Sequence, residues 1–490
     1  MFFNGAWATA GDGATREILN PANNRVIAVV TDGSEHDARL AIAHARRAFD
    51  EGPWPQMRAP ERAAYLFKLA DLIDKNAAAL AELETRNNGK PLREAKYDVA
   101  DAAACFRYYA GLITKPLGQT YEVGDPAIQG MVVREPLGVC GQIIPWNYPL
   151  LMAAWKLAPG LAAGNCCILK PAETTPLTAI ELFKLIAEAG FPPGAAQLLL
   201  GPGHTAGHAL AASLLVDKIA FTGGTVTGRK IMAAATGNIK KITLELGGKS
   251  PCIVFADADF EVALEYAMFA IFAGQGEVCS AGSRLLLDRK IADRFLPRLA
   301  DASARIVVGD GLHPETEMGP LITPAHMEKV LGDIEAGRAE GAETICGGHR
   351  LTAGALAHGN FVAPTIFVNT QPGMKIVREE IFGPVLAVQL FATEEEAIHL
   401  ANDTIYGLAA GVFTGDAGKG LRVLKKLRAG ITWLNTYHST FCEAPWGGYK
   451  QSGLGRELGT CGLDAYLETK QINIHTAPAP LGWFRSAGTG

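Results

Sequence analysis

Residues 218–230 have the sequence Lys-Ile-Ala-Phe-Thr-Gly-Gly-Thr-Val-Thr-Gly-Arg-Lys. This order predicts a strand that enters a glycine-rich turn, from which a helix begins. Such a turn presents backbone N–H groups and the positive end of a helix dipole, both of which suit a phosphate. Gly223 and Gly228 come close to the spacing of a P-loop, but Arg229 and Lys230 follow where a P-loop requires Lys and then Ser or Thr. The segment therefore predicts either a dinucleotide or phosphate site or an ordinary tight turn.

Strands and helices alternate on the amino-terminal side of this segment. Strands are expected at 139–144, 166–169 and 196–200, with helices at 150–163 and 178–189. Two further helical patterns, 58–87 and 92–113, precede them. Alternation at this spacing favours a parallel sheet in an α/β domain.

The same alternation returns on the carboxyl-terminal side. Strands are expected at 250–255, 284–287, 411–413 and 431–434, with helices at 260–272, 392–401 and 419–427. The two halves meet near residues 246–248, whose glycine pair suits a hinge or a crossing point. We therefore expect an α/β fold built from two α/β halves.

Composition and charge narrow the class of protein. The chain has 490 residues, 48% hydrophobic and 19% charged, which is typical of a well-buried globular protein of about two to four packed units. The 45 basic and 50 acidic residues give a net charge of −5 without a long basic run, which argues against nucleic-acid binding. The uncharged stretch 137–155 includes Gln142, Asn147 and two prolines, so we expect a buried strand and loop there, not a membrane span. The N-terminus lacks a signal-peptide pattern, and nine cysteines without a CxxC pair indicate a reduced, cytoplasmic protein.

Three residues have side chains suited to catalysis. Cys279 lies in a loop of small residues, where backbone N–H groups can lower the pKa of a thiol and hold an oxyanion; the alternative is a small buried hydrophobe. Glu245 stands between two leucines, where burial would raise its pKa and suit a general base, unless it caps a turn. Asn147 lies on a loop between Pro145 and Pro149, either as an oxyanion donor or as a turn residue.

The remaining candidates favour structural roles. Cys140, Cys166, Cys167 and Cys252 lie in strand patterns and are expected in the core. His204 and His208 are four residues apart, as metal ligands often are, but no Glu follows His204 and the composition is that of a loop. We therefore expect no metal site.

Six segments give these separate signals a common explanation. They are Pro145-Trp-Asn-Tyr-Pro149, Leu169-Lys-Pro-Ala-Glu173, Phe221-Thr-Gly-Gly-Thr225, Leu244-Glu-Leu-Gly-Gly-Lys249, Glu379-Glu-Ile-Phe-Gly-Pro384 and Pro445-Trp-Gly-Gly-Tyr-Lys450. In this order and spacing they make the chain resemble the NAD(P)-dependent aldehyde dehydrogenase superfamily over nearly its whole length. The resemblance implies a Rossmann-like NAD-binding domain, an α/β catalytic domain and a small β oligomerisation element.

The resemblance also implies a mechanism. The Cys279 thiolate attacks the aldehyde, and the Asn147 amide and the Cys279 backbone N–H hold the oxyanion. Hydride then passes to the nicotinamide, and Glu245 activates the water that hydrolyses the thioester. Lys156 and Glu457 match a pair often assigned to proton relay.

Cofactor contacts follow from the same motifs. The residues implied are Ile144, Pro145, Trp146, Lys170, Glu173, Gly203, Gly223, Gly224, Thr225, Gly228, Leu246, Glu380 and Phe382. Lys170 and Glu173 would hold the adenosine ribose, and Glu380 with Phe382 the nicotinamide ribose. The Glu173 carboxylate repels a 2′-phosphate and so favours NAD, while Lys170 keeps NADP possible.

Within the superfamily the chain looks most like betaine-aldehyde and aminoaldehyde dehydrogenases. Segments 146–152, 155–156 and 442–448 carry this likeness. Tyr148, Trp155 and Trp446 could enclose a trimethylammonium group at about 0.5–2 kcal/mol per ring, with Cys442 also at the substrate. The alternative is that the aromatic rings form a plain apolar wall, as in an aldehyde dehydrogenase of broad specificity.

Two positions depart from that branch. Ala273 stands six residues before the nucleophile, where a tryptophan is frequent, so one wall of the pocket is missing. Glu277 stands two residues before it, where Gln is frequent. A carboxylate there would attract a cation or raise the pKa of Cys279.

The expected organisation has three parts. Residues 1–115 and 134–246 form the NAD-binding domain, 247–465 the catalytic domain, and 116–133 with 466–490 the oligomerisation element of a homodimer or homotetramer. Three rival functions predict different behaviour. An ATPase would bind Mg-ATP and be indifferent to Cys279, a non-catalytic binding protein would need no nucleophile, and a CoA-acylating enzyme would need no water-activating Glu245.

Overall fold

The computed structural model describes residues 1–115, 118–481, 483 and 484. The predicted oligomerisation segments 116–133 and 466–490 extend over 116–117, 482 and 485–490, which lie outside the described residues.

The first sheet has eight strands in the order β19-β11-β10-β7-β8-β9-β1-β2. Their bounds are β1 Phe2–Phe3, β2 Ala6–Trp7, β7 Val139–Ile143, β8 Cys166–Lys170, β9 Ala196–Leu198, β10 Lys218–Thr222, β11 Lys241–Glu245 and β19 Gly453–Leu454. The five central strands are parallel, and β19, β1 and β2 add antiparallel edges. A separate hairpin, β3 Thr15–Asn20 with β4 Arg25–Thr31, lies near the N-terminus.

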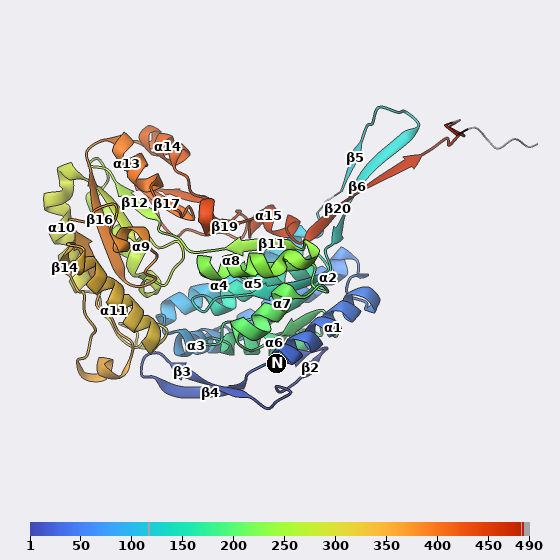
Figure 1. Cartoon of the computed structure of the whole chain (residues 1–490), viewed down its shortest axis with the longest axis horizontal. Helices are drawn as coiled ribbons and strands as arrows, with labels where there is room; N and C mark the ends of the chain where they lie inside the picture. Colours follow the sequence, from blue (N-terminus) through green and yellow to red (C-terminus); the bar gives the residue numbers. More distant parts are fainter. Residues whose placement is uncertain (116–117, 482, 485–490) are drawn as a thin grey trace, which may run out of the picture.

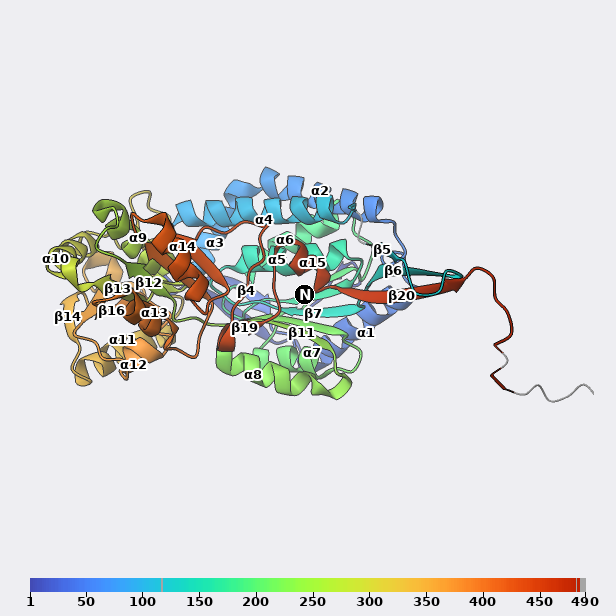
Figure 2. The ribbon, with the colours of Figure 1, turned by 90° about the horizontal axis from the view of Figure 1, so that it is seen from above.

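Helices cover both faces of this sheet. They are α1 Glu35–Glu51, α2 Ala59–Lys75, α3 Ala77–Asn88, α4 Leu92–Leu112, α5 Pro149–Ala162, α6 Leu177–Ala189, α7 His208–Ala212, α8 Thr225–Ala234 and α15 Gly459–Asp464. Figure 2 shows α2–α6 on one side of the sheet and α1, α7 and α8 on the other. Parallel strands buried between two helical layers read as continuous apolar runs, and β7, β8 and β10 are buried at every position.

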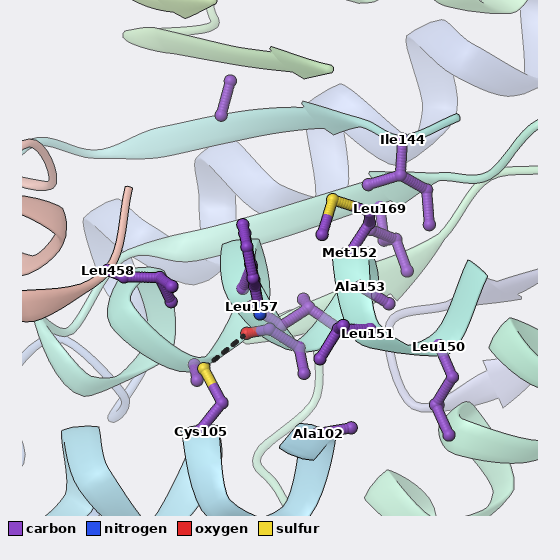
Figure 3. Close-up of a cluster of buried hydrophobic side chains, with 14 of the residues drawn as sticks. Ala102, Cys105, Ile144, Leu150, Leu151, Met152, Ala153, Leu157, Leu169 and Leu458 are labelled. Carbon is purple, nitrogen blue, oxygen red and sulfur yellow. Dashed lines mark hydrogen bonds between the residues drawn. The ribbon is translucent and has the colours of Figure 1, made fainter. Parts of the chain in front are cut away.

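Helix α5 lies at the centre of the core, because each of its fourteen residues is buried. It packs between α4 and β8, and Figure 3 shows Leu150 and Leu157 of α5 in one apolar cluster with Ala102 of α4 and Leu169 of β8. The Cys105 thiol donates a hydrogen bond to a carbonyl of α5 across this contact. The helix therefore fixes the loop that precedes it and the polar side chains that it carries.

The second sheet has seven strands in the order β14-β15-β16-β13-β12-β17-β18, all parallel except β14. Its strands are β12 Pro251–Val254, β13 Arg284–Asp288, β14 Glu343–Cys346, β15 Thr365–Val368, β16 Val385–Phe391, β17 Ala409–Phe413 and β18 Ile431–Leu434. Its helices are α9 Phe260–Phe272, α10 Arg289–Ala304, α11 Pro324–Ala339, α12 Lys375–Arg378, α13 Glu394–Asn402 and α14 Ala417–Lys426. This half forms the second lobe in Figure 1.

A three-stranded arm projects from the first lobe (Figures 1 and 2). It consists of β5 Gln119–Tyr121, β6 Ile128–Pro136 and β20 Leu467–His475. Strand β20 pairs with β6 over its whole length, which ties the carboxyl-terminal end of the chain to residues about 335 positions earlier in the sequence, as the Lys470–Glu135 bond shows.

The α/β fold expected from the sequence is confirmed. One predicted helix is wrong: the pattern over 58–87 forms two helices that meet at Asn76, whose side-chain amide donates to the Leu72 carbonyl and so ends α2. Apolar spacing alone does not reveal such a local side-chain bond. The elements between β13 and α13 were not predicted. No helix among the described residues has the length and apolar character needed to cross a bilayer.

We predict that Leu157→Ala lowers the free energy of unfolding by about 2–5 kcal/mol, because it leaves a cavity in a fully buried helix. Leu214→Ala is the matched control, since Leu214 is 66% exposed and its loss should cost less than about 0.5 kcal/mol. Urea unfolding followed by tryptophan fluorescence measures both. Equal midpoints for the two variants would contradict the packing described here.

Candidate active site

The site lies where the chain passes from the first sheet to the second. Strand β11 ends at Glu245, and β12 begins at Pro251. Between them, a Cβ on Gly247 would collide with the carboxylate of Glu380, and a Cβ on Gly248 would lie 2.5 Å from the carbonyl oxygen of Cys279. Two glycines are therefore required for these three segments to meet.

Cys279 is half-buried in the loop that follows α9. The turn before it needs left-handed backbone, with Gly276 at φ +72° packed against a carbonyl from the 380–384 segment. Burial, with the charges of Glu380 and Glu245, raises the pKa of the Cys279 thiol to about 12. The expectation that backbone N–H groups lower this pKa is corrected: those of Cys279 and Ser280 act in that direction, but burial outweighs them.

Asn147 is buried beside this loop. Its Nδ2 donates a hydrogen bond of 2.8 Å to the backbone carbonyl of Glu277, two residues before the thiol. The loop that carries it is held by Asn88, whose Nδ2 donates to the Trp146 carbonyl at 2.8 Å. An amide nitrogen has two hydrogens, so Asn147 can serve Glu277 and still offer the second hydrogen to an oxyanion.

Glu245 is buried with neither carboxylate oxygen bonded to a partner in the described part of the chain. Burial and the nearby Glu457 raise its pKa well above the ordinary value, although Lys156 opposes the shift. Lys156 forms an ion pair with Glu457 and donates to Thr222 Oγ1 at 2.7 Å. The charges of the predicted relay pair therefore act on the predicted base, although no hydrogen bond joins Glu245 to Glu457 among the described residues.

The glycine-rich turn has the predicted form. Strand β10 ends at Thr222, and α8 begins at Thr225 after Gly223 and Gly224. A Cβ on Gly228 would lie 2.6 Å from the Leu246 side chain, so this glycine allows close packing of the helix on the loop after β11. The backbone N–H of Gly223 is already bonded to the Glu245 carbonyl.

Lys170 and Glu173 follow β8 at the same end of the sheet. The Glu173 carboxylate accepts a bond of 2.5 Å from the Gly203 N–H, and Lys170 Nζ donates to the Pro171 carbonyl at 2.8 Å. Burial opposes the shift, but Lys170 and the N–H groups of Glu173 and Gly203 lower the pKa of Glu173. An ionised carboxylate therefore lies beside the predicted ribose position.

The predicted nicotinamide side is aromatic and acidic. Trp146 and Phe382 meet edge to face with ring centroids 5.2 Å apart. The Gly248 N–H donates to Glu380 at 3.0 Å, while burial raises the pKa of Glu380 to about 7. Two predicted cofactor residues, Ile144 and Pro145, lie between β7 and this tryptophan, and the Ile144 N–H donates to the carbonyl at the end of β8.

The predicted substrate wall is partly assembled. Trp155 and Trp446 are buried with centroids 5.6 Å apart, and Cys442 is half-buried nearby in the same core. Tyr148 differs, because the ammonium of Lys90 lies 4.0 Å from its ring centroid. One face of this ring is therefore already occupied by a cation.

Three residues of this neighbourhood were not found from the sequence. Trp433 extends the aromatic wall, 6.4 Å from Trp446. His438 lies within hydrogen-bonding distance of Ser280 Oγ at 3.2 Å, and burial lowers its pKa to about 4, so it is neutral at neutral pH. Lys90 belongs to a buried ion pair with Asp98. Trp433 could have been suspected from its place near the end of the predicted strand 431–434. The sequence around His438 and Lys90 has no pattern that points to either residue.

The histidine pair does not gather ligands. His204 lies in a short π-helix, Gly203–Gly207, and His208 begins α7. Over the ranges that the structure describes, no group of three His, Cys, Asp or Glu side chains could hold a metal ion.

Comparison with known proteins follows this geometry. The model of the aldehyde dehydrogenase family matches residues 7–472. The betaine aldehyde dehydrogenase of Bacillus subtilis is 52% identical over 486 residues, 99% of each chain. The human mitochondrial aldehyde dehydrogenase is 46% identical, over 97% of this chain and 91% of that one. A crystal structure of betaine aldehyde dehydrogenase from Staphylococcus aureus in complex with NAD+ superposes with a TM-score of 0.98 at 46% identity, covering 99% and 96% of the two chains.

We predict that alkylation of Cys279 by iodoacetamide accelerates about tenfold per pH unit from about pH 7 to about pH 10 in the free protein. The raised pKa leaves little thiolate at neutral pH, and the thiolate fraction grows until the pH reaches the pKa. Peptide mass analysis locates the label, and Cys279→Ser is the control. A rate that levels off at or below about pH 9 would show a thiol of ordinary or lowered pKa.

Proposed function

Because the chain belongs to the aldehyde dehydrogenase family, we propose that it oxidises betaine aldehyde, or a related ω-aminoaldehyde, to the carboxylic acid with NAD. The resemblance inferred from the sequence is confirmed by the family match and by full-length relatives at 46–52% identity. The observation that carries the proposal is the grouping of Cys279, Asn147 and Glu245 around one glycine crossing point.

In the proposed reaction, the Cys279 thiol first loses its proton to solvent water, and the thiolate attacks the aldehyde carbon. Asn147 donates a hydrogen bond to the resulting oxyanion. Bound NAD supplies the hydride acceptor. Loss of hydride converts the thiohemiacetal on Cys279 into a thioester. Glu245 then takes a proton from water as the water attacks the thioester, so the acid leaves and the thiol is restored.

The proton that Glu245 takes must leave the buried site before the next turnover. Its neighbour Glu457 is paired with Lys156, and all three side chains are buried. When Glu245 takes a proton, the net charge of the cluster changes by one unit. Passing that proton to Glu457 and on to solvent restores the original charge. We propose Lys156 and Glu457 as this relay.

The cofactor residues are proposed in the roles that the motifs imply. The N-terminal end of α8, with Gly223, Gly224 and Thr225, would hold the pyrophosphate. Lys170 and Glu173 would hold the adenosine ribose. Glu380 and Phe382 would face the nicotinamide ribose. The ionised Glu173 supports NAD, because it would repel the 2′-phosphate of NADP.

The substrate proposal depends on the aromatic wall. Trp155, Trp446 and Trp433 provide adjoining rings, and neutral His438 adds no positive charge that would repel a quaternary ammonium. Tyr148 contributes less than the sequence suggested, because Lys90 already lies over its ring. The alternative is an aldehyde dehydrogenase of broad specificity. The 46% identity to the human mitochondrial aldehyde dehydrogenase is the observation that supports it.

We also propose a cytoplasmic homodimer or homotetramer. The arm of β5, β6 and β20 projects from the body, and beyond it Leu481, Trp483 and Phe484 are exposed. Such an arm suits pairing with another copy of the chain. The nine cysteines are all free thiols, as a reduced compartment would keep them.

We predict that betaine aldehyde exceeds 3,3-dimethylbutanal in kcat/KM by about tenfold or more. The two aldehydes have the same shape and differ in charge, so the change in this ratio when one aromatic ring is removed reports the cation–π contribution of that ring. Trp446→Leu should reduce the ratio toward one, as measured by initial rates of NADH formation. A ratio near one in the unmodified enzyme would favour the broad-specificity alternative.

We predict that Glu245→Gln gives a burst of about one NADH per active site followed by slow turnover, because hydride transfer precedes the step that needs the base. Rapid-mixing absorbance measures the burst. Cys279→Ala should give neither burst nor turnover. Full steady-state activity in Glu245→Gln would remove this residue from the hydrolytic step.

A further inference from the structure

Glu277 departs from the family pattern, and its side chain points away from the proposed substrate pocket. The carboxyl group is 1% exposed. Its Oε1 accepts a bond of 3.0 Å from the Ile322 N–H and lies 3.6 Å from His326 Nε2, while Oε2 accepts from Gln275 Nε2 at 3.3 Å. The carboxylates that raise the pKa of Cys279 are Glu380 and Glu245. The expectation that Glu277 raises the pKa of Cys279 is therefore corrected, because its carboxyl group bonds to the segment just before α11 and other carboxylates act on the thiol.

Helix α11 connects this contact to the segment 380–382. Ile322 lies just before the N-cap of α11, where the helix dipole favours an acidic partner. In the first turns of the same helix, His326 Nε2 is 2.7 Å from the Phe382 carbonyl oxygen, to which it donates since a carbonyl only accepts. One turn later, Lys329 Nζ donates to the Glu380 and Ile381 carbonyls at 3.1 and 2.7 Å.

The main chain of Glu277 makes the opposite connection. Its carbonyl oxygen accepts the 2.8 Å bond from Asn147, the proposed oxyanion donor. The His326 ring also packs against Trp146, the neighbour of Asn147, with centroids 5.3 Å apart. The backbone of Glu277 therefore contacts Asn147, the proposed oxyanion donor. Its carboxyl group is connected through α11 to the segment 380–382, which is proposed to face the nicotinamide ribose.

We propose that Glu277 and His326 are positioning residues that, through the N-terminal turns of α11, fix the Cys279 loop relative to the segment 380–382 and so set the geometry of hydride transfer. This rests on the proposed roles of Asn147 and Glu380, but not on which aldehyde is the substrate. A displacement of about 1 Å between reacting groups can cost about 100-fold in rate, so a modest slackening of this connection should be measurable.

The carboxyl group of Glu277 accepts its hydrogen bonds from uncharged donors, the Ile322 N–H and the Gln275 side-chain amide. Burial raises the pKa of Glu277 well above its ordinary value, although these two hydrogen bonds and the charge of Lys90 oppose the shift. Gln275 Oε1 is buried without a partner among the described residues, and a turn of its amide would let it accept an N–H from a glutamine at position 277. Glutamine at position 277 has the same shape and can make the same contacts.

The test compares single-turnover NADH formation in a set of variants. Glu277→Ala and His326→Ala should slow hydride transfer about 10–100-fold, and the double variant should be no slower than the slower single variant, because both act through one connection. Glu277→Gln should stay within about threefold of the unmodified enzyme. Glu328→Ala, on the exposed face of α11, is the matched control and should stay within about twofold.

A second readout separates positioning from general damage. Alkylation of Cys279 by iodoacetamide, which needs no hydride transfer, should change less than about threefold in the alanine variants. If an alanine variant does not fold, Glu277→Asp shortens the side chain by one methylene and should slow hydride transfer by about tenfold with alkylation unchanged.

Three results would overturn the proposal. They are unchanged hydride transfer in Glu277→Ala or Glu277→Asp, equal losses in Glu277→Gln and Glu277→Ala, and strictly multiplicative losses in the double variant. Turnover of the unmodified enzyme in the same assay reports on the proposed function itself, and the ratio of each variant to it reports on positioning. The two can therefore fail separately.

Discussion

The close approach of three chain segments at Gly247 and Gly248 is the constraint on which the rest of the site depends. The Glu380 carboxylate and the Cys279 carbonyl both occupy space that a side chain at these positions would fill. The glycine pair also carries the chain from one sheet to the other, so the fold and the site meet at one place. This crossing brings together Glu245 at the end of β11, Cys279 after α9 and Glu380 before β16. These three residues are far apart in the sequence.

Burial sets the chemistry of these groups. Glu245, Cys279 and Glu380 all have raised pKa values, and in each case burial is the main cause. At neutral pH the Cys279 thiol therefore keeps its proton, and it becomes a nucleophile only when that proton leaves. Lys156 supplies the buried positive charge that makes a nearby pair of carboxyl groups tolerable.

Features with a local signature were predictable from the sequence. The strand, glycine turn and helix over 218–230, the Cys279 loop and the crossing at 246–248 each follow from a short run of residues. The direction of Glu277, the cation over Tyr148 and the His438 contact do not, because partners far apart in the sequence decide them. Asn147 meets Glu277 across 130 positions, and Lys156 meets Glu457 across 301. Sequence motifs and the family resemblance could name these residues but not show which groups they face.

The central claim is that oxidation proceeds through a covalent bond to Cys279. Glu245→Gln protein can be mixed with betaine aldehyde and NAD, quenched in acid within seconds, digested and examined by mass spectrometry. The account predicts a trimethylglycyl thioester on the peptide that contains Cys279, formed only when NAD is present. Acid production without this adduct, or the adduct on a different cysteine, would contradict it.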